Sequence, residues 1–355
     1  MELFAVIMAG GVGARFWPRS RREKPKQLIQ IFGQNTMIQD TVNRLEGLIK
    51  NENIYVITNQ IQKDSIVDQL NQVPKENIIA EPFGKNTAAC IGLASILIHN
   101  KSKDAVTIIL PADHLIQDKE GFQTTLITAA NFAYKTDGLI TIGIKPTRPE
   151  TGYGYIQIVE RKIENNVYKV QTFAEKPNLS TAKRFVEAGD FLWNSGMFIW
   201  KTDVILNEIS LYLPELYDGM IELEKTISTK NFDETLEKVY GQLISISIDY
   251  GIMEKSNKVF LVSGNFDWSD VGSWEEVYQL SGKDENGNAK IGDVYTENTF
   301  GSYVFNPKKF TALVGLENII VIETDDSLLI CNRDNVQDVK HVVDYLKMNN
   351  KDNLL

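Results

Sequence analysis

The residues most able to do chemistry lie near the start of the chain, where three glycines are followed by a basic segment. Gly10, Gly11 and Gly13 come directly after an apolar run, and glycine backbone can bring its N–H groups close to phosphates or to a base. The motif is neither a P-loop, which needs GxxxxGK(S/T), nor a dinucleotide fingerprint, which needs a glycine where this chain has Phe16. Six basic residues fall within the twelve positions from 15 to 26, namely Arg15, Arg19, Arg21, Arg22, Lys24 and Lys26. In a chain of net charge −10, this concentration favours the binding of a polyphosphate over a merely solvated basic loop.

Carboxylates that follow predicted strands could hold a metal ion beside such a polyphosphate. Asp113 follows the buried strand expected at 106–110 after Pro111 and Ala112, and ligands of open α/β sheets bind at the carboxyl ends of the strands. We interpret Asp113 as a Mg²⁺ ligand, with capping of the next helix as the alternative. Asp267 and Asp270 follow the strand expected at 259–262, and the sequence leaves open which of them would be the second ligand.

The elements that must position these residues alternate between strand and helix. Continuous apolar runs predict buried strands at 3–8, 54–57, 78–80, 106–110 and 139–142. Helical spacing predicts helices at 37–49 and 87–99. Asn86 or Thr87 could cap the second helix, and this role can hold alongside recognition of a base. The alternation predicts an α/β fold with a doubly wound sheet and right-handed crossovers.

The second half of the chain has a different pattern of apolar residues. The alternating segments 153–158 and 168–173 predict an antiparallel pair, and helices separate the strand-like runs 197–200 and 244–248. The polar segment 283–288 is the best candidate linker, so we expect a catalytic domain at 1–282 and a small C-terminal β domain at 283–355. Short strands around residues 304, 313, 320 and 329 and a final amphipathic helix at 336–346 are expected there. Packing or oligomerisation is the role expected for this tail.

Composition excludes several other classes of protein. The net charge of −10 is unsuited to general nucleic-acid binding, which needs a basic face. Cys90 and Cys331 give no metal-ligand spacing, and three histidines without an HExxH motif do not indicate a zinc enzyme. We expect no membrane span, because no apolar run approaches about 18 residues. The apolar run at 3–8 is too short for a signal peptide, so a reducing cytoplasm is expected.

The chain resembles the mannose-1-phosphate guanylyltransferases of the bacterial type, within the sugar nucleotidyltransferase family. The matching stretches are 10–18, 25–27, 81–82 with 85–88, 111–114, 148–156, 175–177, 193–198, 247–250 and 266–272. They occur in the family's order over nearly the whole of the expected catalytic domain. The glycine loop and Lys26 mark sugar nucleotidyltransferases in general. Pro25-Lys26-Gln27, Lys85-Asn86-Thr87 and Asn194-Ser195-Gly196-Met197-Phe198 are typical of the mannose branch.

The resemblance implies a role for each matching residue. The residues implied to hold the nucleotide are Ala9, Gly10, Gly11, Gly13, Glu81, Asn86, Thr87, Pro111 and Asp113. Arg15 and Lys26 are implied to stabilise its phosphates, and Asp113 and Asp270 to hold the metal, which decides between Asp267 and Asp270. The residues implied to hold mannose 1-phosphate are Gly152, Tyr153, Glu175, Lys176, Asn194 and Asp249, with Lys176 on the phosphate. For each residue on the sugar side, a structural hydrogen bond or ion pair is the alternative.

The resemblance also implies the reaction. A phosphate oxygen of mannose 1-phosphate attacks the α-phosphorus of GTP in line, so that GDP-mannose forms and diphosphate leaves, with Mg²⁺ as the cofactor. Because the nucleophile is already an anion on the substrate, no protein nucleophile is needed. Arg15, Lys26, Asp113 and Asp270 would serve catalysis by positioning and charge neutralisation. The alternatives are a nucleotidyltransferase that uses dTTP or UTP with glucose 1-phosphate, and a non-catalytic homologue that senses GDP-mannose.

The implied fold is a Rossmann-like, GT-A-like mixed sheet followed by a C-terminal domain that is like a left-handed β-helix. A homodimer in the cytoplasm is expected. Longer relatives carry a cupin-type phosphomannose isomerase domain, for which this chain has no room, so isomerase activity is not expected.

Overall fold

The computed structural model describes residues 1–11, 13–164, 166–174 and 176–355, and the chain forms two compact units. The first unit comprises Met1–Gly10, Thr41–Ala112 and Ile116–Trp268. The second unit comprises Gly11–Asp40, Asp113–Leu115 and Ser269–Leu355. Both units therefore combine distant parts of the sequence, and they cut across the domain boundary expected between residues 282 and 283. That boundary stays a prediction about which parts fold separately.

A nine-stranded mixed sheet forms the centre of the first unit, with the strand order β3-β2-β1-β4-β9-β6-β10-β8-β7 and an additional pairing of β7 with β9. Its strands are β1 (Glu2–Met8), β2 (Ile54–Asn59), β3 (Ile78–Glu81), β4 (Ala105–Pro111), β6 (Leu139–Ile144), β7 (Tyr155–Ile158), β8 (Val167–Ala174), β9 (Phe191–Lys201) and β10 (Val259–Gly264). The pairs β1–β2, β2–β3, β1–β4 and β6–β10 are parallel, whereas β9 pairs antiparallel with β4 and β6. The predicted antiparallel pair is confirmed as β7 and β8. Parallel strands covered on both faces must be apolar throughout, and Phe4, Ala5, Val6 and Ile7 of β1 are fully buried.

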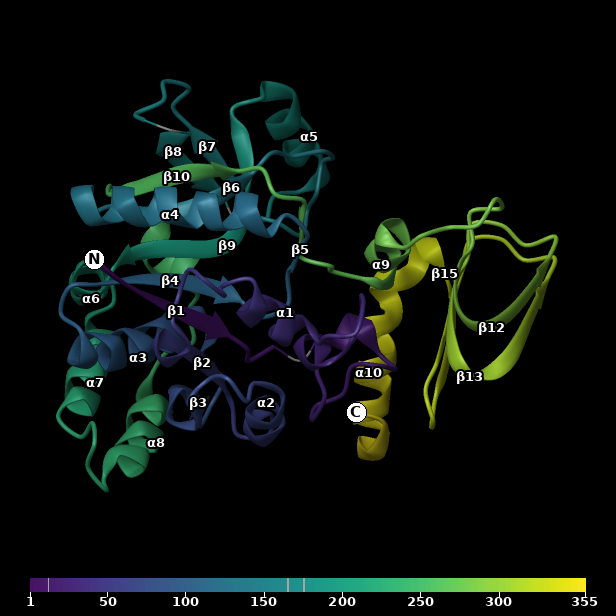
Figure 1. Ribbon diagram of the computed structural model, residues 1–355, viewed down its shortest axis with the longest axis horizontal. Helices are drawn as coiled ribbons and strands as arrows, with labels where there is room; N and C mark the ends of the chain where they lie inside the picture. The colour runs from purple at the N-terminus through teal and green to yellow at the C-terminus, as the bar shows by residue number, and fades with distance from the viewer. Residues whose placement is uncertain (12, 165, 175) are drawn as a thin grey trace. The chain divides into compact units, whose positions relative to one another are not determined.

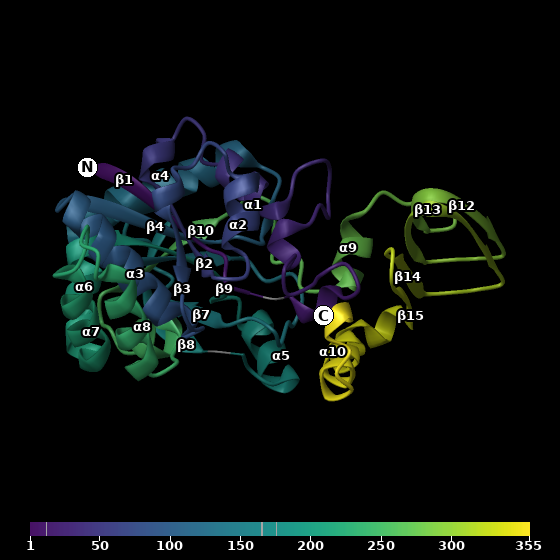
Figure 2. The same ribbon diagram turned by 90° about the horizontal axis from the view of Figure 1, so that it is seen from below.

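Helices cover both faces of this sheet, which confirms the doubly wound α/β fold. Figures 1 and 2 show α4 (Lys119–Thr136) on one face, with α3 (Asn86–Lys101) and α6 (Thr202–Tyr212) on the other. The other α-helices of the first unit are α2 (Lys63–Gln69), α5 (Leu179–Ala188), α7 (Pro214–Glu224) and α8 (Phe232–Gln242), with a π-helical turn at Asp249–Met253. Helix α1 (Met37–Asn43) begins in the second unit and ends in the first. Ten of the sixteen residues of α3 are buried. A helix that is apolar on most sides is a core helix, and α3 packs against the sheet, α6 and α7.

The second unit is built around short strands, which confirms the small β domain expected near the C-terminus. Its elements are α9 (Trp274–Leu280), β12 (Ala289–Glu297), β13 (Tyr303–Val314), β14 (Ile319–Glu323), β15 (Leu328–Asn332) and α10 (Val339–Met348), with 3₁₀ turns at Ala14–Phe16, Lys26–Leu28, Arg333–Asp338 and Asp352–Leu354. β12, β13 and β14 pair in parallel and β15 closes the sheet in antiparallel fashion. Parallel stacking of successive short strands is the pattern of a β-helix. The left-handed winding of this segment stays a prediction.

One segment differs from the expectation. The run 244–248 alternates like a strand but forms none, because its backbone bonds to the start of α3 instead of to a sheet. The Ala88 N–H donates to the Ile246 carbonyl oxygen at 3.2 Å, and the Ile248 N–H donates to Thr87 Oγ1 at 2.9 Å. These bonds satisfy backbone groups that a strand would have paired with a neighbour. The expected strand was therefore wrong.

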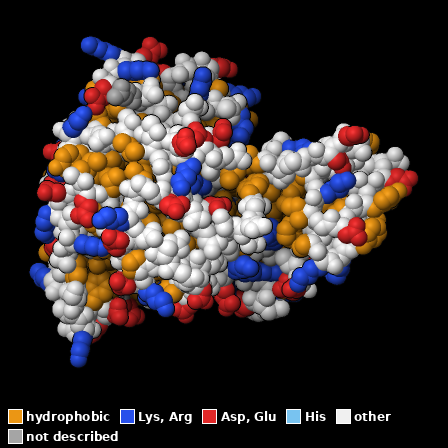
Figure 3. Space-filling view, viewed as in Figure 1, with side chains coloured by type: hydrophobic (Ala, Val, Ile, Leu, Met, Phe, Trp, Pro, Cys, Tyr) orange, Lys and Arg blue, Asp and Glu red, His pale blue; other side chains and the backbone are white. Residues whose placement is uncertain are grey.

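Two surface properties bear on function. Among the residues that the structure describes, no helix is both long enough and apolar enough to cross a bilayer. Figure 3 shows basic and acidic side chains interspersed over the visible face. On this face, positive charge for a polyphosphate would have to come from a local group of residues rather than from a broad basic surface.

Candidate active site

The ends of two neighbouring strands determine where the glycine loop and Asp113 begin. β1 and β4 pair in parallel with Met8 opposite Pro111, and the Ala112 N–H donates to the Met8 carbonyl oxygen at 3.1 Å. Both strands therefore end at the same level of the sheet. The segments that follow, starting with Gly11 and Asp113, belong to the second unit. This confirms the expectation that the loop and the carboxylate leave the sheet at one edge.

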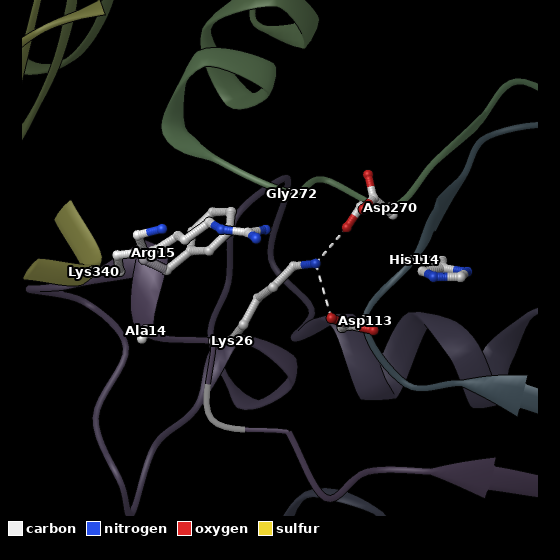
Figure 4. A pocket seen from close by; sticks show the side chains of 10 residues that line it. Ala14, Arg15, Lys26, Asp113, His114, Asp270, Gly272 and Lys340 are labelled. Atoms are coloured by element: carbon white, nitrogen blue, oxygen red, sulfur yellow. Dashed lines mark hydrogen bonds and ion pairs between the residues drawn. The ribbon is translucent and has the colours of Figure 1, made fainter. Parts of the chain in front are cut away.

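Within the second unit, a hollow of about 420 Å³ brings the four predicted catalytic residues together (Figure 4). Its lining consists of Gly13, Ala14, Arg15, Phe16, Lys26, Asp113, His114, Asp270, Gly272 and Lys340. Arg15, Lys26, Asp113 and Asp270 come from three separate segments of the sequence, so only the fold makes them neighbours. His114 and Lys340 were not predicted from the sequence.

Lys26 lies at the centre of this group. Its side chain is 6% exposed, and Nζ donates to Asp113 Oδ2 at 2.9 Å and to the backbone carbonyl oxygen of Asp270 (Figure 4). Burying an ammonium group is costly unless it is paired, and these two acceptors supply the pairing. Burial acts to raise the pKa of Asp113, but the charge of Lys26, the charge of His114 and the hydrogen bond from Lys26 lower it below its ordinary value. Asp113 is therefore ionised at neutral pH.

Gly13 gives Lys26 the room that it occupies. Gly13 has a left-handed backbone with φ 66°, and a Cβ added there would lie 2.7 Å from Lys26 Cβ. Real atoms of this kind do not approach so closely, so both the conformation and the space require glycine. Gln27 Nε2 also donates to the Gly11 carbonyl oxygen at 2.9 Å, which ties the loop to the Lys26 turn. Gly13 is thus needed for the internal packing of the hollow.

The turn that carries Asp270 is held in an unusual conformation. Val271 has φ 45°, which a β-branched residue adopts only when its surroundings force it, and its side chain is fully buried. The Val271 N–H donates to Ser269 Oγ at 3.0 Å, and the Gly272 N–H donates to the Glu276 carboxylate. The side chain of Val271 packs in the same core as Trp274 at the start of α9. This anchoring holds the backbone of the turn next to Asp270, and Asp270 lines the hollow.

Asp113 and Asp270 fit a divalent cation that also binds phosphate oxygens. Mg²⁺ prefers oxygen ligands and is commonly held by one or two carboxylates together with substrate phosphates. Among the described residues, no cluster of three or more His, Cys, Asp or Glu side chains could hold a metal without help. The ammonium of Lys26 beside both aspartates shows that positive charge is favourable at this point. Helix capping does not explain Asp113, because Asp118 caps α4 by accepting from the Gly121 N–H.

Glu81 lies in the first unit, at the end of β3, and is 9% exposed. Tyr240 Oη is 3.1 Å from Glu81 Oε1 and 3.2 Å from the Ala89 carbonyl oxygen, so its hydroxyl donates to this pair of acceptors. Burial raises the pKa of Glu81 to about 7, although the hydrogen bond from Tyr240 lowers it. Gly10 lies against Glu81, because a Cβ on Gly10 would be 3.9 Å from Glu81 Oε2. No signal in the sequence pointed to Tyr240, an ordinary residue on the buried side of α8.

Asn86 and Thr87 begin α3, yet neither acts as its N-cap. Lys85 is the N-cap and makes no side-chain capping bond. Asn86 has φ 65°, and its Oδ1 accepts from the Thr87 N–H at 2.8 Å. Thr87 Oγ1 accepts from the Ile248 N–H, directly before Asp249. The simple capping interpretation is therefore wrong, and Thr87 positions the segment that leads to Asp249.

The residues assigned to the sugar phosphate are also in the first unit. Asn194 Nδ2 donates to Asp249 Oδ1 at 2.9 Å, and Thr141 Oγ1 donates to Asn194 Oδ1 at 3.2 Å. Asp249 begins the π-helical turn, and such turns are frequent at functional sites. The structure thus pairs two predicted residues that are far apart in the sequence.

The other sugar-side predictions are placed individually. The Tyr153 ring packs edge-on against Trp193 and Trp268, with centroids 5.1 and 5.4 Å away. The Gly152 N–H donates to Glu150 Oε1 at 3.0 Å. Lys176 has a left-handed backbone with φ 39°. Glu175 lies outside the described residues.

Comparisons with known proteins match nearly the whole length of this chain to sugar nucleotidyltransferases. The family model described as "Nucleotidyl transferase" matches residues 4–287, and that described as "MannoseP isomerase/GMP-like beta-helix domain" matches residues 294–346. The chain is 39% identical to "Mannose-1-phosphate guanylyltransferase" of Salmonella muenchen, over 99% of this chain and 74% of the relative. It is 37% identical to the protein of the same name from Klebsiella pneumoniae, over 98% and 75%. A crystal structure of a protein described as "mannose-1-phosphate geranyltransferase", from Thermus thermophilus, matches with a TM-score of 0.89 at 31% identity, over 98% of this chain and 100% of that one.

Proposed function

The chain belongs to the nucleotidyl transferase family, and we propose that it is a mannose-1-phosphate guanylyltransferase, which converts GTP and mannose 1-phosphate into GDP-mannose and diphosphate. The observation that carries the proposal is the hollow in which Arg15, Lys26 and two aspartates converge. These residues suit a triphosphate and its metal ion. The names of the curated relatives support the choice of sugar and nucleotide.

The reaction requires charge neutralisation and alignment rather than a protein nucleophile. A phosphate oxygen of mannose 1-phosphate forms a bond to the α-phosphorus of GTP. The bond from that phosphorus to the oxygen shared with the β-phosphate breaks, and diphosphate leaves with the electron pair. Arg15 and Lys26 stabilise the negative charge that develops on the leaving group, in a site where they are already in place.

Asp113 and Asp270 would hold Mg²⁺ or a similar divalent cation. When bound, such an ion neutralises phosphate charge and helps to align the reacting groups. Lys26 keeps Asp113 ionised, as its low pKa indicates, and therefore keeps it ready to act as a ligand.

The remaining residues are assigned to the two substrates. Those proposed to hold the nucleotide are Ala9, Gly10, Gly11, Gly13, Glu81, Asn86, Thr87 and Pro111. Those proposed to hold mannose 1-phosphate are Gly152, Tyr153, Lys176, Asn194 and Asp249, with Glu175 as a further assignment outside the described residues. The Asn194–Asp249 hydrogen bond supports the sugar assignment, because it orients two polar groups together.

A substrate panel tests the proposal. Diphosphate release is measured for GTP, dTTP and UTP, each with mannose 1-phosphate and with glucose 1-phosphate, in the presence and absence of Mg²⁺. We expect kcat/KM with GTP and mannose 1-phosphate to exceed every other combination by at least about 100-fold. Fast turnover of dTTP or UTP with glucose 1-phosphate alone would contradict the choice of substrates. Tight binding of GDP-mannose without turnover would instead favour a sensor.

A cytoplasmic homodimer completes the proposal. Both cysteines are free thiols, which supports a reducing compartment. Analytical ultracentrifugation of the purified chain tests the dimer, and a single species of monomer mass at micromolar concentration would contradict it.

A further inference from the structure

Two cations that line the hollow have no anionic partner in the part of the chain that the structure describes. Among the described residues, neither Arg15 nor Lys340 takes part in an ion pair, whereas Lys26 is paired with Asp113. Both line the hollow, and Figure 4 shows Lys26 between Arg15 on one side and Asp113 on the other. Two like charges that face one cavity repel each other, and an anion between them removes the repulsion. The hollow is therefore suited to an anionic ligand that lies near both Arg15 and Lys340.

The fold holds Lys340 in place beside this hollow. Lys340 lies in the first turn of α10, directly after the buried Val339. Val339, Val343 and Leu346 pack in the same core as Phe16 and Trp17, which follow Arg15 in the chain. The helix that carries Lys340 and the turn that carries Arg15 therefore belong to one packed body, which keeps their backbones at a constant spacing.

We propose that Lys340 is a further phosphate-binding residue, which contacts the β- and γ-phosphates of the nucleotide and the diphosphate formed from them. This inference rests on the proposed function and extends it to the region that matches a separate β-helix family model. A nucleoside triphosphate brings about four negative charges. Asp113 offsets part of the charge of Lys26, so Arg15 and Lys340 supply further positive charge at the terminal phosphates. The C-terminal segment then contributes directly to substrate binding and is not confined to packing.

The test compares Lys340→Ala with Lys340→Arg and with a matched control, Lys347→Ala. Lys347 lies two turns further along the same face of α10, is exposed, and does not line the hollow. Lys340→Ala should raise KM for GTP in the forward direction and KM for diphosphate in the reverse direction by about tenfold, equivalent to about 1.4 kcal/mol. KM for mannose 1-phosphate should change less than twofold. Lys340→Arg should restore most of the loss, because it keeps the charge.

A solvated surface lysine would behave differently. It would leave both KM values within twofold of wild type, and that result would overturn the proposal. An equal rise of KM for mannose 1-phosphate, or an equal effect of Lys347→Ala, would also overturn it, because the effect would then not be local to the terminal phosphates. Thermal unfolding of both Lys340 variants should match wild type, since the described structure gives Lys340 no ion pair to lose.

A binding measurement separates this inference from the proposed function. Inorganic diphosphate is titrated into each protein in the presence of Mg²⁺ and its affinity is measured by calorimetry. This measurement needs no turnover. If wild type fails to use GTP and mannose 1-phosphate, the proposed function fails, yet a tenfold loss of diphosphate affinity in Lys340→Ala still supports the contact. If wild type turns over these substrates and the variant binds diphosphate as tightly as wild type, the inference about Lys340 alone fails.

Discussion

Asp113 and Asp270 both face Lys26, but they do so with different atoms. Asp113 accepts through its carboxylate, and Asp270 accepts through its backbone carbonyl. An asparagine at position 270 keeps the backbone acceptor, whereas an asparagine at position 113 removes the only carboxylate paired with the buried ammonium of Lys26 among the described residues. The two substitutions should therefore differ in their effect on folding while sharing an effect on metal-dependent turnover.

We predict that Asp113→Asn and Asp270→Asn each lower kcat/KM by about 100-fold or more, because each removes a ligand of the divalent cation. Only Asp113→Asn should also lower the free energy of unfolding. The loss should be about 1–3 kcal/mol, less than for a fully buried pair because Asp113 is 39% exposed. Steady-state kinetics and urea denaturation measure the two effects. Full activity in either variant would refute the metal assignment, and equal stability of the two variants would refute the role given to the ion pair.

Glu81 gives the free energy of unfolding a pH dependence of its own. Its pKa in the folded protein is about 7, above the ordinary value of 4.5. A raised pKa means that the folded state prefers the protonated form. The contribution to stability is therefore complete below about pH 4.5 and is lost as the pH rises through 7.

We predict that Glu81→Gln removes this dependence. Between pH 5 and pH 8, wild type should lose about 2 kcal/mol more unfolding free energy than the variant. Urea denaturation at both pH values measures the difference. Glu46→Gln is the control, because the Glu46 side chain is 83% exposed. Tyr240→Phe removes the hydrogen bond that lowers the pKa of Glu81, so it should move the pH dependence to higher pH. Identical pH profiles for wild type and Glu81→Gln would show that Glu81 is ionised normally.

Among single residues, the sequence could indicate chemistry only where a motif carried it. Arg15, Lys26, Asp113 and Asp270 stand next to glycines, prolines or strand ends, and the fold brings all four to one hollow. Tyr240 and Lys340 belong to amphipathic helices, where tyrosine and lysine are common for reasons of packing and solubility. Their roles depend on what faces them across the fold, which local spacing does not encode.

At the scale of elements, the glycine loop and the Lys26 turn depend on each other for space. Gly13 and Gly33 have nearly the same backbone, with φ 66° and 71°, but only Gly13 has a close neighbour. A Cβ on Gly13 meets Lys26 Cβ, which is the rigid base of the side chain and not its flexible end. A Cβ on Gly33 meets nothing within 4 Å. Substituting Gly13 and Gly33 in turn thus separates the free-energy cost of backbone strain from the cost of displacing Lys26.

We predict that Gly33→Ala loses about 1 kcal/mol of unfolding free energy, from the left-handed backbone alone. Gly13→Ala should lose about 2–4 kcal/mol and should also lower kcat/KM, because Lys26 must move. Chemical denaturation and steady-state kinetics on both variants measure these effects. Equal losses of stability together with unchanged kinetics would mean that Gly13 serves only as a turn.

The elements themselves were predictable to different degrees. Continuous apolar runs identified β1, β2, β3, β4 and β6. A strand that is buried on both faces needs apolar residues at nearly every position, and this pattern is visible in the sequence. The run 244–248 misled because alternation shows which side chains are covered, but not whether a neighbouring strand is present. In the fold the partner of this run is the start of α3, and its bonds go to Thr87 and Ala88. Such tertiary pairing has no local signal.

At the scale of the molecule, the second unit contains the β-helix region together with parts of the nucleotidyl transferase region. Arg333, in the β-helix region, makes a two-pronged ion pair with Glu275 at 2.7 and 2.6 Å and lies 3.7 Å from the centre of the Tyr278 ring. Arg333 Nη1 also donates to the Gly301 carbonyl oxygen at 2.9 Å. Glu275 and Tyr278 belong to α9, in the nucleotidyl transferase region, close in sequence to Asp270. A domain boundary placed at residue 282 of the sequence could not reveal that α9 and the β-helix region belong to one compact unit.

We predict that Arg333→Ala destabilises the second unit by about 1–3 kcal/mol and lowers turnover at temperatures near the new melting point. The variant loses both the two hydrogen bonds of the partly buried Arg333 guanidinium to Glu275 and its stacking on Tyr278. Arg333→Lys should recover only part of the stability, because an ammonium cannot make the two parallel bonds. Differential scanning calorimetry measures the change. A melting profile of Arg333→Ala that matches wild type would show that the two regions are held together by apolar packing alone.

The second unit can close only late in protein synthesis. Trp17 Nε1 donates to the Leu354 carbonyl oxygen at 2.9 Å, and Trp274 Nε1 donates to the Trp17 carbonyl oxygen at 3.2 Å. A ribosome adds about 5–20 residues per second, so residues 11–40 wait on the order of tens of seconds for these partners. During that interval Phe16 and Trp17 are uncovered on the nascent chain and offer binding sites to chaperones. The glycine loop, although made first, acquires its working shape only after translation has passed residue 354.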